Sequence, residues 1–346
     1  MSDQTPLAPK VMTILGCQVD IESTAIREES RFHIKANICE KKFEWIVYDY
    51  QDTLDVTPLP NFFSSIIYDP YSVSLRNKVF GVPSIERNIY VLSKIIIEDL
   101  LDSQRGTLHT TENARLLLNI EMVNTMNNII VLPCYEEKEN TRHLSRVSLQ
   151  FPLLHKSRLS SPELEYLIDV TENHPIQIII HFLLTPQDFN SFTTECTLIF
   201  PSTMILSKTI HTSDNLPKWT SDMLISDYLL AVESKLTYSW SSRRGFMEEL
   251  RRIAAVVEFD PVDFSFISIV LRQKLGKRYV VCTVEIRFSS SFPNTAPYLT
   301  IYDLQTTYST PIDSNTVKYS SHWSTQRAAR EIFLQSCELV HKQAFG

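Results

Sequence analysis

Hydrophobic and polar residues alternate near the start of the chain in the pattern of paired antiparallel strands. Residues 31–38 carry apolar side chains at every second position, which places on one face Phe32, Ile34, Ala36 and Ile38. A polar turn is predicted at residues 40–42, and residues 43–50 then form a second segment rich in aromatic and β-branched residues. Together the two segments predict a β-hairpin.

Helical periodicity follows the hairpin. Pro83 and Ser84 are expected to open a helix that ends before Gly106. Its apolar positions recur at the helical spacing, at Ile85, Ile89, Leu92, Ile96 and Leu100. A second helix is predicted over residues 111–124, from the spacing of Leu116, Leu117, Ile120 and Met122.

The middle of the chain reads as short strands whose ends are marked by prolines. The predicted strands cover residues 128–132, 144–151, 176–184 and 194–200. Proline is disfavoured inside a sheet because it has no N–H to donate, so its placement at the segment ends favours a meander of antiparallel strands.

The last third repeats helix and strand signals. Residues 221–257 are predicted to be mostly helical, with a break near Gly245. Strands are expected over residues 265–271 and 279–288, joined by a turn at Gly276 and Lys277. A final helix is predicted over residues 324–345, capped by Ser324 or Thr325.

These blocks of antiparallel strands and helices predict an α+β fold. The chain has 346 residues, which suits two or three domains better than one. We expect an N-terminal domain at residues 1–110, a middle domain at 111–221 and a C-terminal domain at 222–346. No low-complexity segment separates them.

Composition narrows the class of protein. A net charge of −7 argues against a general nucleic-acid binder, because phosphate neutralisation needs a surplus of lysine and arginine. No apolar stretch reaches the roughly 20 residues that a membrane-spanning helix needs. The first residues lack the pattern of a secretory signal, and the 6 cysteines form no C-x-x-C pair. We therefore expect a soluble protein of the cytoplasm and nucleus, with no membrane partner.

The sequence offers little for catalysis, metals or cofactors. Its 6 glycines are scattered, so no glycine-rich phosphate loop is present. Its 9 histidines show no zinc-binding spacing, and His33 and His181 lie in strand-like segments, where a histidine is expected to be a solvent-facing or hydrogen-bonded structural residue. No cofactor, metal site or catalytic residue is predicted.

One loop motif is more informative. A predicted strand ends at Phe292 and Pro293, and three residues later Pro297 opens the next strand. Proline at these positions ends ladder pairing, while the aromatic ring can pack inward over the turn. With a helix before it and Trp323 and a helix after it, this loop resembles the signature of the ubiquitin-conjugating fold.

The catalytic part of that signature is missing. Between Tyr302 and Trp323 the chain has no cysteine and no His-Pro-Asn, so both the thioester nucleophile and the asparagine donor are absent. Cys282 and Cys337 are expected to be buried core thiols. The C-terminal domain thus resembles a ubiquitin-conjugating-enzyme variant (UEV), and residues 57–60 resemble a degenerate copy of the same loop.

The chain as a whole resembles the BRE (brain and reproductive organ-expressed) family of tandem UEV-type proteins. The similarity is densest at Arg243 and Arg244, residues 256–260, Phe292 and Pro293, the Trp323 segment and residues 343–345. The resemblance implies a non-catalytic scaffold of a BRISC-type complex that deubiquitinates lysine-63-linked chains. Its implied partners are a zinc metalloprotease, an Abraxas-type scaffold and a von Willebrand-like adaptor, with ubiquitin a candidate ligand. A related nuclear complex acts in the DNA-damage response.

Alternatives stay open at this point. One alternative to the BRISC-type scaffold is a generic UEV or RWD-type adaptor of a ligase or trafficking complex. Another is a divergent conjugating enzyme that uses Cys282 or Cys337. Four arginines on one predicted helix are candidate partner contacts or a solvated face: Arg243, Arg244, Arg251 and Arg252. Trp323 is either core packing or a partner contact.

Overall fold

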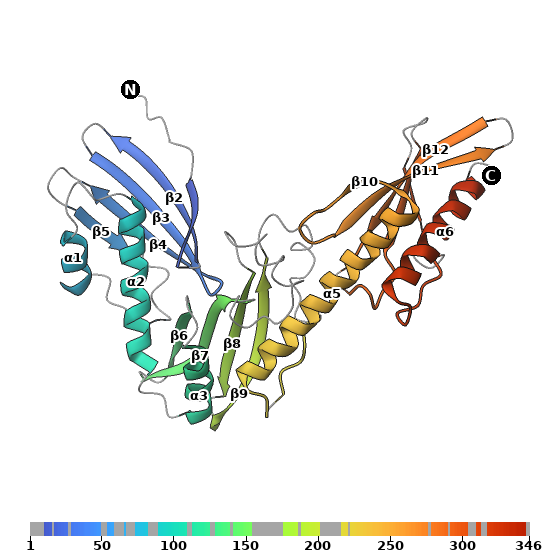
Figure 1. Ribbon diagram of the computed structural model, residues 1–346. Helices are drawn as coiled ribbons and strands as arrows, with labels where there is room; N and C mark the ends of the chain where they lie inside the picture. The colour runs from blue at the N-terminus through green and yellow to red at the C-terminus, as the bar shows by residue number, and fades with distance from the viewer. Residues whose placement is uncertain are drawn as a thin grey trace. The chain divides into compact units, whose positions relative to one another are not determined.

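The computed structural model describes most of the chain in ordered segments. These segments cover residues 10–15, 17–26, 29–49, 54–58, 66, 73–81, 89–108, 113–124, 129–138, 141–153, 176–185, 188–200, 216–220, 222–275, 278–289, 291–303, 309–312 and 317–343. They form an α+β protein with antiparallel sheets, as predicted (Figure 1). No helix in these segments combines the length and the apolar character needed to cross a membrane.

The chain divides into two compact units. The first comprises Met1–Pro152, Gln177–Thr197 and Leu224–Ser226, and the second comprises Leu153–Ile176, Leu198–Met223 and Asp227–Gly346. The first unit contains two sheets and the second contains one. The division into three domains stays a prediction.

The first sheet of the first unit is a meander in which each strand pairs with the next in sequence. Its strands are β1 (Lys10–Ile14), β2 (Cys17–Ile26), β3 (Glu29–Ile38), β4 (Lys41–Asp49) and β5 (Leu54–Pro58). The predicted hairpin is β3 paired with β4, and Ile34, Ala36 and Ile38 are buried as the alternation requires. The buried face continues on β4 with Phe43 and Trp45, whose rings stack 6.1 Å apart.

The β3–β4 turn lies one residue earlier than predicted. It consists of Cys39 and Glu40, whose φ angles are 48° and 65°. Two consecutive residues with positive φ form the hairpin turn that matches the twist of paired strands, and glycine or asparagine is usual there. Because this sequence uses neither, other contacts must stabilise the turn.

Three helices lie in the described part of the first unit. They are α1 (Val73–Phe80), α2 (Ile89–Thr107) and α3 (Ala114–Asn124). Helix α2 passes through Gly106, so its predicted end before this glycine is wrong; a Cβ at Gly106 would meet nothing within 4 Å. The predicted start at Pro83 and Ser84, with Ile85, lies outside the described residues. Helix α3 is capped by Asn113, whose Oδ1 accepts from Leu116 N at 2.9 Å.

The second sheet of the first unit confirms the predicted meander. Its strands run in the order β6 (Ile130–Lys138), β7 (Thr141–Pro152), β8 (Gln177–Thr185) and β9 (Asp188–Ile199). β8 is buried over most of its length, since Ile178, Ile179, Ile180 and Phe182 are all enclosed. Burial of both faces explains its nearly continuous apolar sequence.

One long helix, α5 (Ile225–Ile253), lies in the second unit from Asp227 onward. The predicted break near Gly245 is wrong, because the helix is continuous there. Gly245 instead permits close approach: a Cβ on it would lie 3.2 Å from Oγ1 of Thr325, the first residue of α6 (Thr325–Gln343). α6 starts as predicted, with Ser324 Oγ accepting from Arg327 N at 3.3 Å.

The sheet of the second unit is a five-stranded meander. Its strands follow α5 and precede α6 along the chain. Its strands are β10 (Ala255–Phe259), β11 (Phe266–Leu275), β12 (Arg278–Arg287), β13 (Tyr298–Asp303) and β14 (Ser309–Ile312). β11 and β12 are the two predicted strands, and they pair from Phe266↔Arg287 to Leu275↔Arg278. The predicted turn residues Gly276 and Lys277 lie outside the described residues.

Candidate functional site

The loop between β12 and β13 holds the motif that the sequence singles out. Phe292, Pro293 and Pro297 are all buried, and the Phe292–Pro293 peptide bond is cis. Two backbone hydrogen bonds shape the turn: Phe292 N donates to Ser289 O at 3.2 Å, and Asn294 N donates to Ser291 O at 2.7 Å. The loop is therefore a folded part of the core rather than a surface excursion.

Aromatic contacts surround Phe292. Its ring centroid lies 4.6 Å from that of Phe288, 5.8 Å from that of Phe246 on α5 and 6.3 Å from that of Tyr319. The pair with Phe246 is edge-to-face, which is favourable for ring quadrupoles. With an exposed fraction of 1%, Phe292 is buried as predicted.

Polar contacts hold the loop carbonyls. Ser239 Oγ on α5 donates to Phe292 O at 2.9 Å, and Tyr319 Oη donates to Pro293 O at 2.7 Å. Burial, with a smaller contribution from Tyr238, raises the pKa of Tyr319 to about 12. The phenol therefore stays protonated and remains a donor at neutral pH. The loop is tied to α5 on one side and to the segment before α6 on the other.

Trp323 lies at the start of α6 and is only partly buried. Its ring packs edge-on against Tyr319, with centroids 5.8 Å apart, and the Arg327 guanidinium lies 5.2 Å from its centroid. It continues the aromatic cluster of Phe292 and Tyr319 toward the surface, so it has a packing role and retains an accessible part.

Arg243 does not lie on a solvated face. Its side chain is buried, its Nε donates to Asp263 O at 2.8 Å and its Nη1 donates to Ser239 Oγ at 3.1 Å. Burial lowers the pKa of Arg243 to about 10, against the opposing effect of the nearby carboxylates of Asp263 and Asp260. Arg243 is an internal link between α5 and the β10–β11 connection, so the expected surface position is wrong for it.

The other three arginines are accessible but are held in separate local contacts. Arg244 donates to Glu248 Oε1 at 2.9 Å, and its guanidinium lies 5.5 Å from the Trp240 ring centroid. Arg251 lies 4.9 Å from the Phe259 ring centroid. Arg252 donates to Glu249 Oε2 at 3.3 Å. The four predicted residues therefore do not form one continuous basic surface.

Glu249 joins the two helices of the second unit. Its carboxylate accepts from Arg330 Nε of α6 at 2.7 Å, and this bond, more than the contact with Arg252, lowers the pKa of Glu249. Because the carboxylate ionises more readily in the fold than in the unfolded chain, its contribution to stability is present above the ordinary pKa of 4.5. The contribution is lost as the pH falls through the lower folded pKa.

We therefore expect Glu249→Gln to destabilise the protein at pH 7 and to have a smaller effect in acid. Urea unfolding at pH 7 and near pH 3.5 measures the difference between variant and wild type. Glu248→Gln is the matched control, since its pair with Arg244 is exposed and contributes little. An equal loss of stability at both pH values would contradict the assigned role of the carboxylate.

The two cysteines considered as nucleophiles lie in different environments. Cys282 is buried in β12, as predicted, whereas Cys337 on α6 is only partly buried, contrary to the expectation of a core thiol. Burial raises the pKa of the Cys337 thiol, which leaves it mainly protonated at neutral pH. Cys282 lies in the strand that precedes the motif loop and Cys337 in the last helix, so neither lies in the loop itself or between Tyr302 and Trp323.

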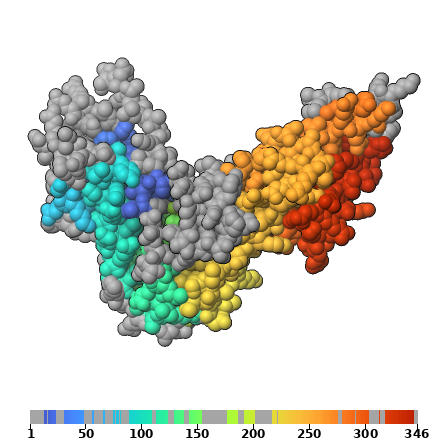
Figure 2. Space-filling view, viewed as in Figure 1, coloured from blue at the N-terminus to red at the C-terminus, as the bar shows by residue number. Residues whose placement is uncertain are grey.

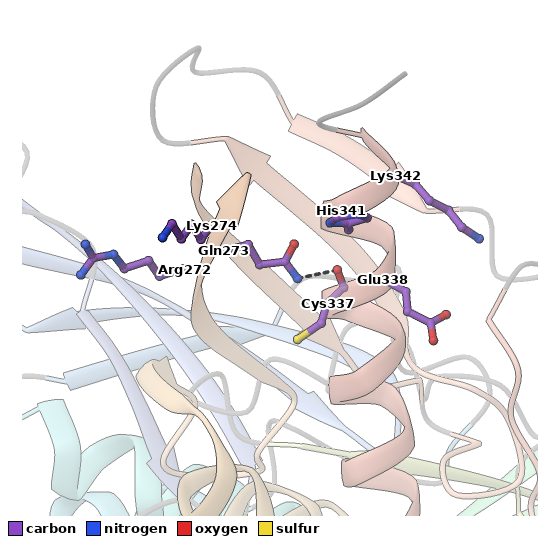
Figure 3. Close-up of a pocket in the computed structure, with 7 residues that line it drawn as sticks. All are labelled: Arg272, Gln273, Lys274, Cys337, Glu338, His341 and Lys342. Atoms are coloured by element: carbon purple, nitrogen blue, oxygen red, sulfur yellow. Dashed lines mark hydrogen bonds between the residues drawn. The ribbon is translucent and has the colours of Figure 1, made fainter. Parts of the chain in front are cut away.

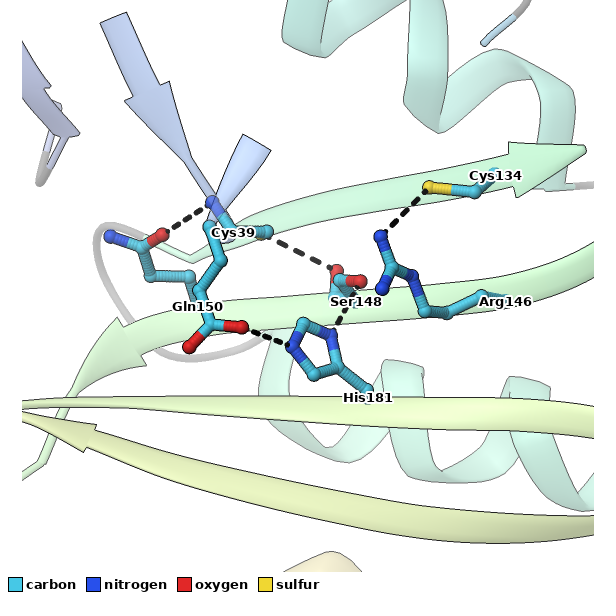
Figure 4. Close-up of polar contacts among 7 residues, drawn as sticks. Cys39, Cys134, Arg146, Ser148, Gln150 and His181 are labelled. Atoms are coloured by element: carbon cyan, nitrogen blue, oxygen red, sulfur yellow. Dashed lines mark hydrogen bonds and ion pairs between the residues drawn. The ribbon is translucent and has the colours of Figure 1, made fainter. Parts of the chain in front are cut away.

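A second polar cluster lies in the first unit, where the β3–β4 turn meets the sheet of β6–β9 (Figure 4). Cys39 N donates to Gln150 Oε1 at 2.8 Å, and the Cys39 thiol lies 3.8 Å from Ser148 O. His181 is buried, with Nδ1 2.8 Å from Ser148 Oγ and Nε2 3.1 Å from Glu40 Oε2. These contacts hold both positive-φ residues of the turn.

The combination of Ser148, His181 and Glu40 has the residue types of a hydrolase triad but not its access. Ser148 is fully buried, so no substrate carbonyl reaches its hydroxyl. The carboxylate is that of Glu40 in the β3–β4 turn, and its contact with His181 stabilises this turn. The cluster therefore has a structural role, which agrees with the predicted role of His181.

His33 has a similar role on the surface of the first sheet. Its Nε2 lies 2.8 Å from Glu44 Oε2, and its Nδ1 lies 3.7 Å from Glu22 Oε2.

Across the described segments no three histidine, cysteine, aspartate or glutamate side chains gather in a way that could hold a metal ion.

The sequence did not identify the partners of these residues. Glu40 and His181 are 141 positions apart, and Arg243 and Asp263 are 20 apart, so no local pattern joins them. Ser148 and Gln150 alternate with apolar residues in β7, a pattern that predicts a solvent-facing polar side, so the sequence did not indicate that both side chains are buried. Buried polar residues in such a strand require partners.

No protein-family model matches the chain, and no curated protein sequence matches it either. The resemblance to the BRE family therefore depends on residues and motifs of this chain alone.

Proposed function

We propose that this chain is a non-catalytic scaffold subunit of a BRISC-type complex that deubiquitinates lysine-63-linked chains. In this role it bridges a zinc metalloprotease and its Abraxas-type partner to a von Willebrand-like adaptor. A related nuclear complex in the DNA-damage response is a second setting for the same subunit. The fold in this proposal is a tandem array of UEV or RWD-type domains at residues 1–110, 111–221 and 222–346.

One observation carries the proposal. In the second unit, the loop of Phe292, Pro293 and Pro297 connects two strands of a meander that follows α5 and precedes α6, while the sequence from Tyr302 to Trp323 contains no cysteine. This order of elements supports a UEV-type domain, and the missing thiol supports a role without thioester chemistry. The Phe292 ring and the Pro293 carbonyl of this loop are held in contacts within the unit, as expected of a loop with a structural role.

Affinity purification of the tagged full-length chain from its own cells tests the partners. We expect a zinc metalloprotease, an Abraxas-type protein and a von Willebrand-like protein to co-purify in comparable amounts. Recovery of ligase or trafficking subunits in their place would favour the generic adaptor and would reject the BRISC-type assignment.

A thioester assay tests the chemistry separately. Incubated with ubiquitin, activating enzyme and ATP, the purified chain should form no adduct that dithiothreitol removes. The variants Cys282→Ala and Cys337→Ala are the controls. An adduct lost in either variant would identify a nucleophile and would overturn the non-catalytic assignment.

A further inference from the structure

β11 extends beyond the strand beside it, which leaves one of its edges unpaired. β10 pairs with β11 only from Phe259↔Ile267 to Ala255↔Val270. β11 continues to Leu275, paired with β12 on its other side. Along Arg272–Leu275, no strand in the described part of the chain occupies the β10 side. The N–H and C=O groups of such an edge can pair with another extended chain.

A pocket of about 580 Å³ opens at this edge, between β11 and the last turns of α6. Among the described side chains, its lining consists of Arg272, Gln273 and Lys274 of β11 and of Cys337, Glu338, His341 and Lys342 of α6 (Figure 3). Gln273 Nε2 donates to Cys337 O of α6 at 2.6 Å, which holds the helix against one face of the strand. Figure 2 shows α6 (red) beside the orange strand residues on the surface of this unit.

Positive charge lies on both faces of this edge. Arg272 and Lys274 point away from α6, whereas Gln273 points toward it; His341 lies on α6, and the Lys342 side chain extends outward from the same helix (Figure 3). This arrangement follows from the alternation of side chains along a strand. Among the described residues that line the pocket, Glu338 is the one carboxylate, although the whole chain carries a net charge of −7.

The cations are exposed and therefore accessible. Arg272, Lys274 and Lys342 all have exposed side chains. The Arg272 guanidinium lies 4.2 Å from the ring centroid of Tyr279, which is itself 47% exposed. Tyr279 belongs to β12, so this contact draws the guanidinium toward β12 and away from the unpaired side, without neutralising its charge.

We propose that the unpaired edge at Arg272–Leu275 binds an acidic, extended segment of a partner protein as an added strand. Backbone hydrogen bonds to β11 supply affinity, as in other cases of strand addition. An added strand directs successive side chains to opposite faces, so its acidic residues meet Lys274 on one face and the end of α6, which carries Lys342, on the other. The same cations disfavour a neutral strand and a second copy of this edge. The inference is independent of the complex proposed above.

Fluorescence anisotropy with the full-length chain tests this inference. The probe is a fluorescein-labelled octapeptide of glutamate and valine, and we expect saturable binding. Lys274→Glu and Lys342→Glu, one on each face, should each weaken binding about tenfold. Lys94→Glu is the matched control, because it reverses an exposed lysine of α2 in the first unit and should leave binding unchanged. Circular dichroism confirms that the variants fold.

Two further probes distinguish strand addition from simple attraction of anions. The same octapeptide with N-methyl groups at alternate residues keeps its charge but loses backbone donors, so it should bind at least several-fold more weakly. Inorganic tripolyphosphate should compete poorly. The proposal is overturned if the acidic peptide does not bind, or if both lysine variants bind it like wild type. Equal binding of the methylated peptide, with efficient competition by tripolyphosphate, would mean an anion site and would reject strand addition.

Discussion

Phe292→Ala should destabilise the second unit by about 3–5 kcal/mol, the usual cost of truncating a large buried aromatic side chain. The ring packs among Phe246, Phe288 and Tyr319, which lie on α5, at the end of β12 and before α6 respectively. Its removal leaves a cavity where these segments meet. Urea unfolding, followed by the fluorescence of the tryptophans, measures the loss.

Tyr298→Ala is a suitable control for this experiment. Tyr298 is an aromatic residue at the start of β13, close in sequence to the loop, but it is 56% exposed. Its truncation should change the free energy of unfolding by less than about 1 kcal/mol. If Phe292→Ala unfolded at the same urea concentration as wild type, the loop would not be the centre of packing that its contacts indicate.

Arg243→Ala should lower the free energy of unfolding by a comparable amount, because it removes a buried charge rather than a large apolar side chain. The guanidinium is the cation beside two buried carboxylates, those of Asp260 and Asp263, and it donates to the Asp263 carbonyl. Removing one member of a buried charged group leaves the others uncompensated, which costs about 3–5 kcal/mol. Urea unfolding at neutral pH measures the effect.

The neighbouring arginine provides the comparison. Arg244 is partly exposed and pairs with Glu248, so Arg244→Ala should cost no more than about 1 kcal/mol. The two substitutions differ by a single position on α5 and remove the same side chain. Similar stabilities of the two variants would contradict the internal role assigned to Arg243.

Much of the fold followed from local patterns. The alternation in residues 31–38 predicted β3, and the proline-bounded apolar runs predicted the meander of β6–β9. The cap at Ser324 and the burial of Phe292 were also predicted correctly. These features depend on residues that are close in sequence, because strand alternation, helix capping and proline geometry act over a few positions.

Errors arose where a residue serves a contact with a distant segment. Gly245 was interpreted as a helix break, but its missing side chain accommodates Thr325, 80 positions later. The turn was placed at residues 40–42, whereas Cys39 and Glu40 adopt positive φ with support from Gln150 and His181. Neither partner is visible to a rule that considers only neighbouring residues.

Some features of the candidate sites were also predictable from local sequence, and others required the folded structure. The sequence predicted the loop of Phe292 and Pro293 and the absence of a thiol after it, because both are properties of composition and spacing. It predicted the same surface position for Arg243 and Arg244, although successive helical residues are rotated by about 100° from each other. This rotation turns Arg243 inward to Asp263 and leaves Arg244 in solvent. The unpaired edge at Arg272–Leu275 also required the folded structure, since it exists only because β10 begins opposite Val270. Burial and pairing depend on which segments meet, and that is set by packing over the whole unit.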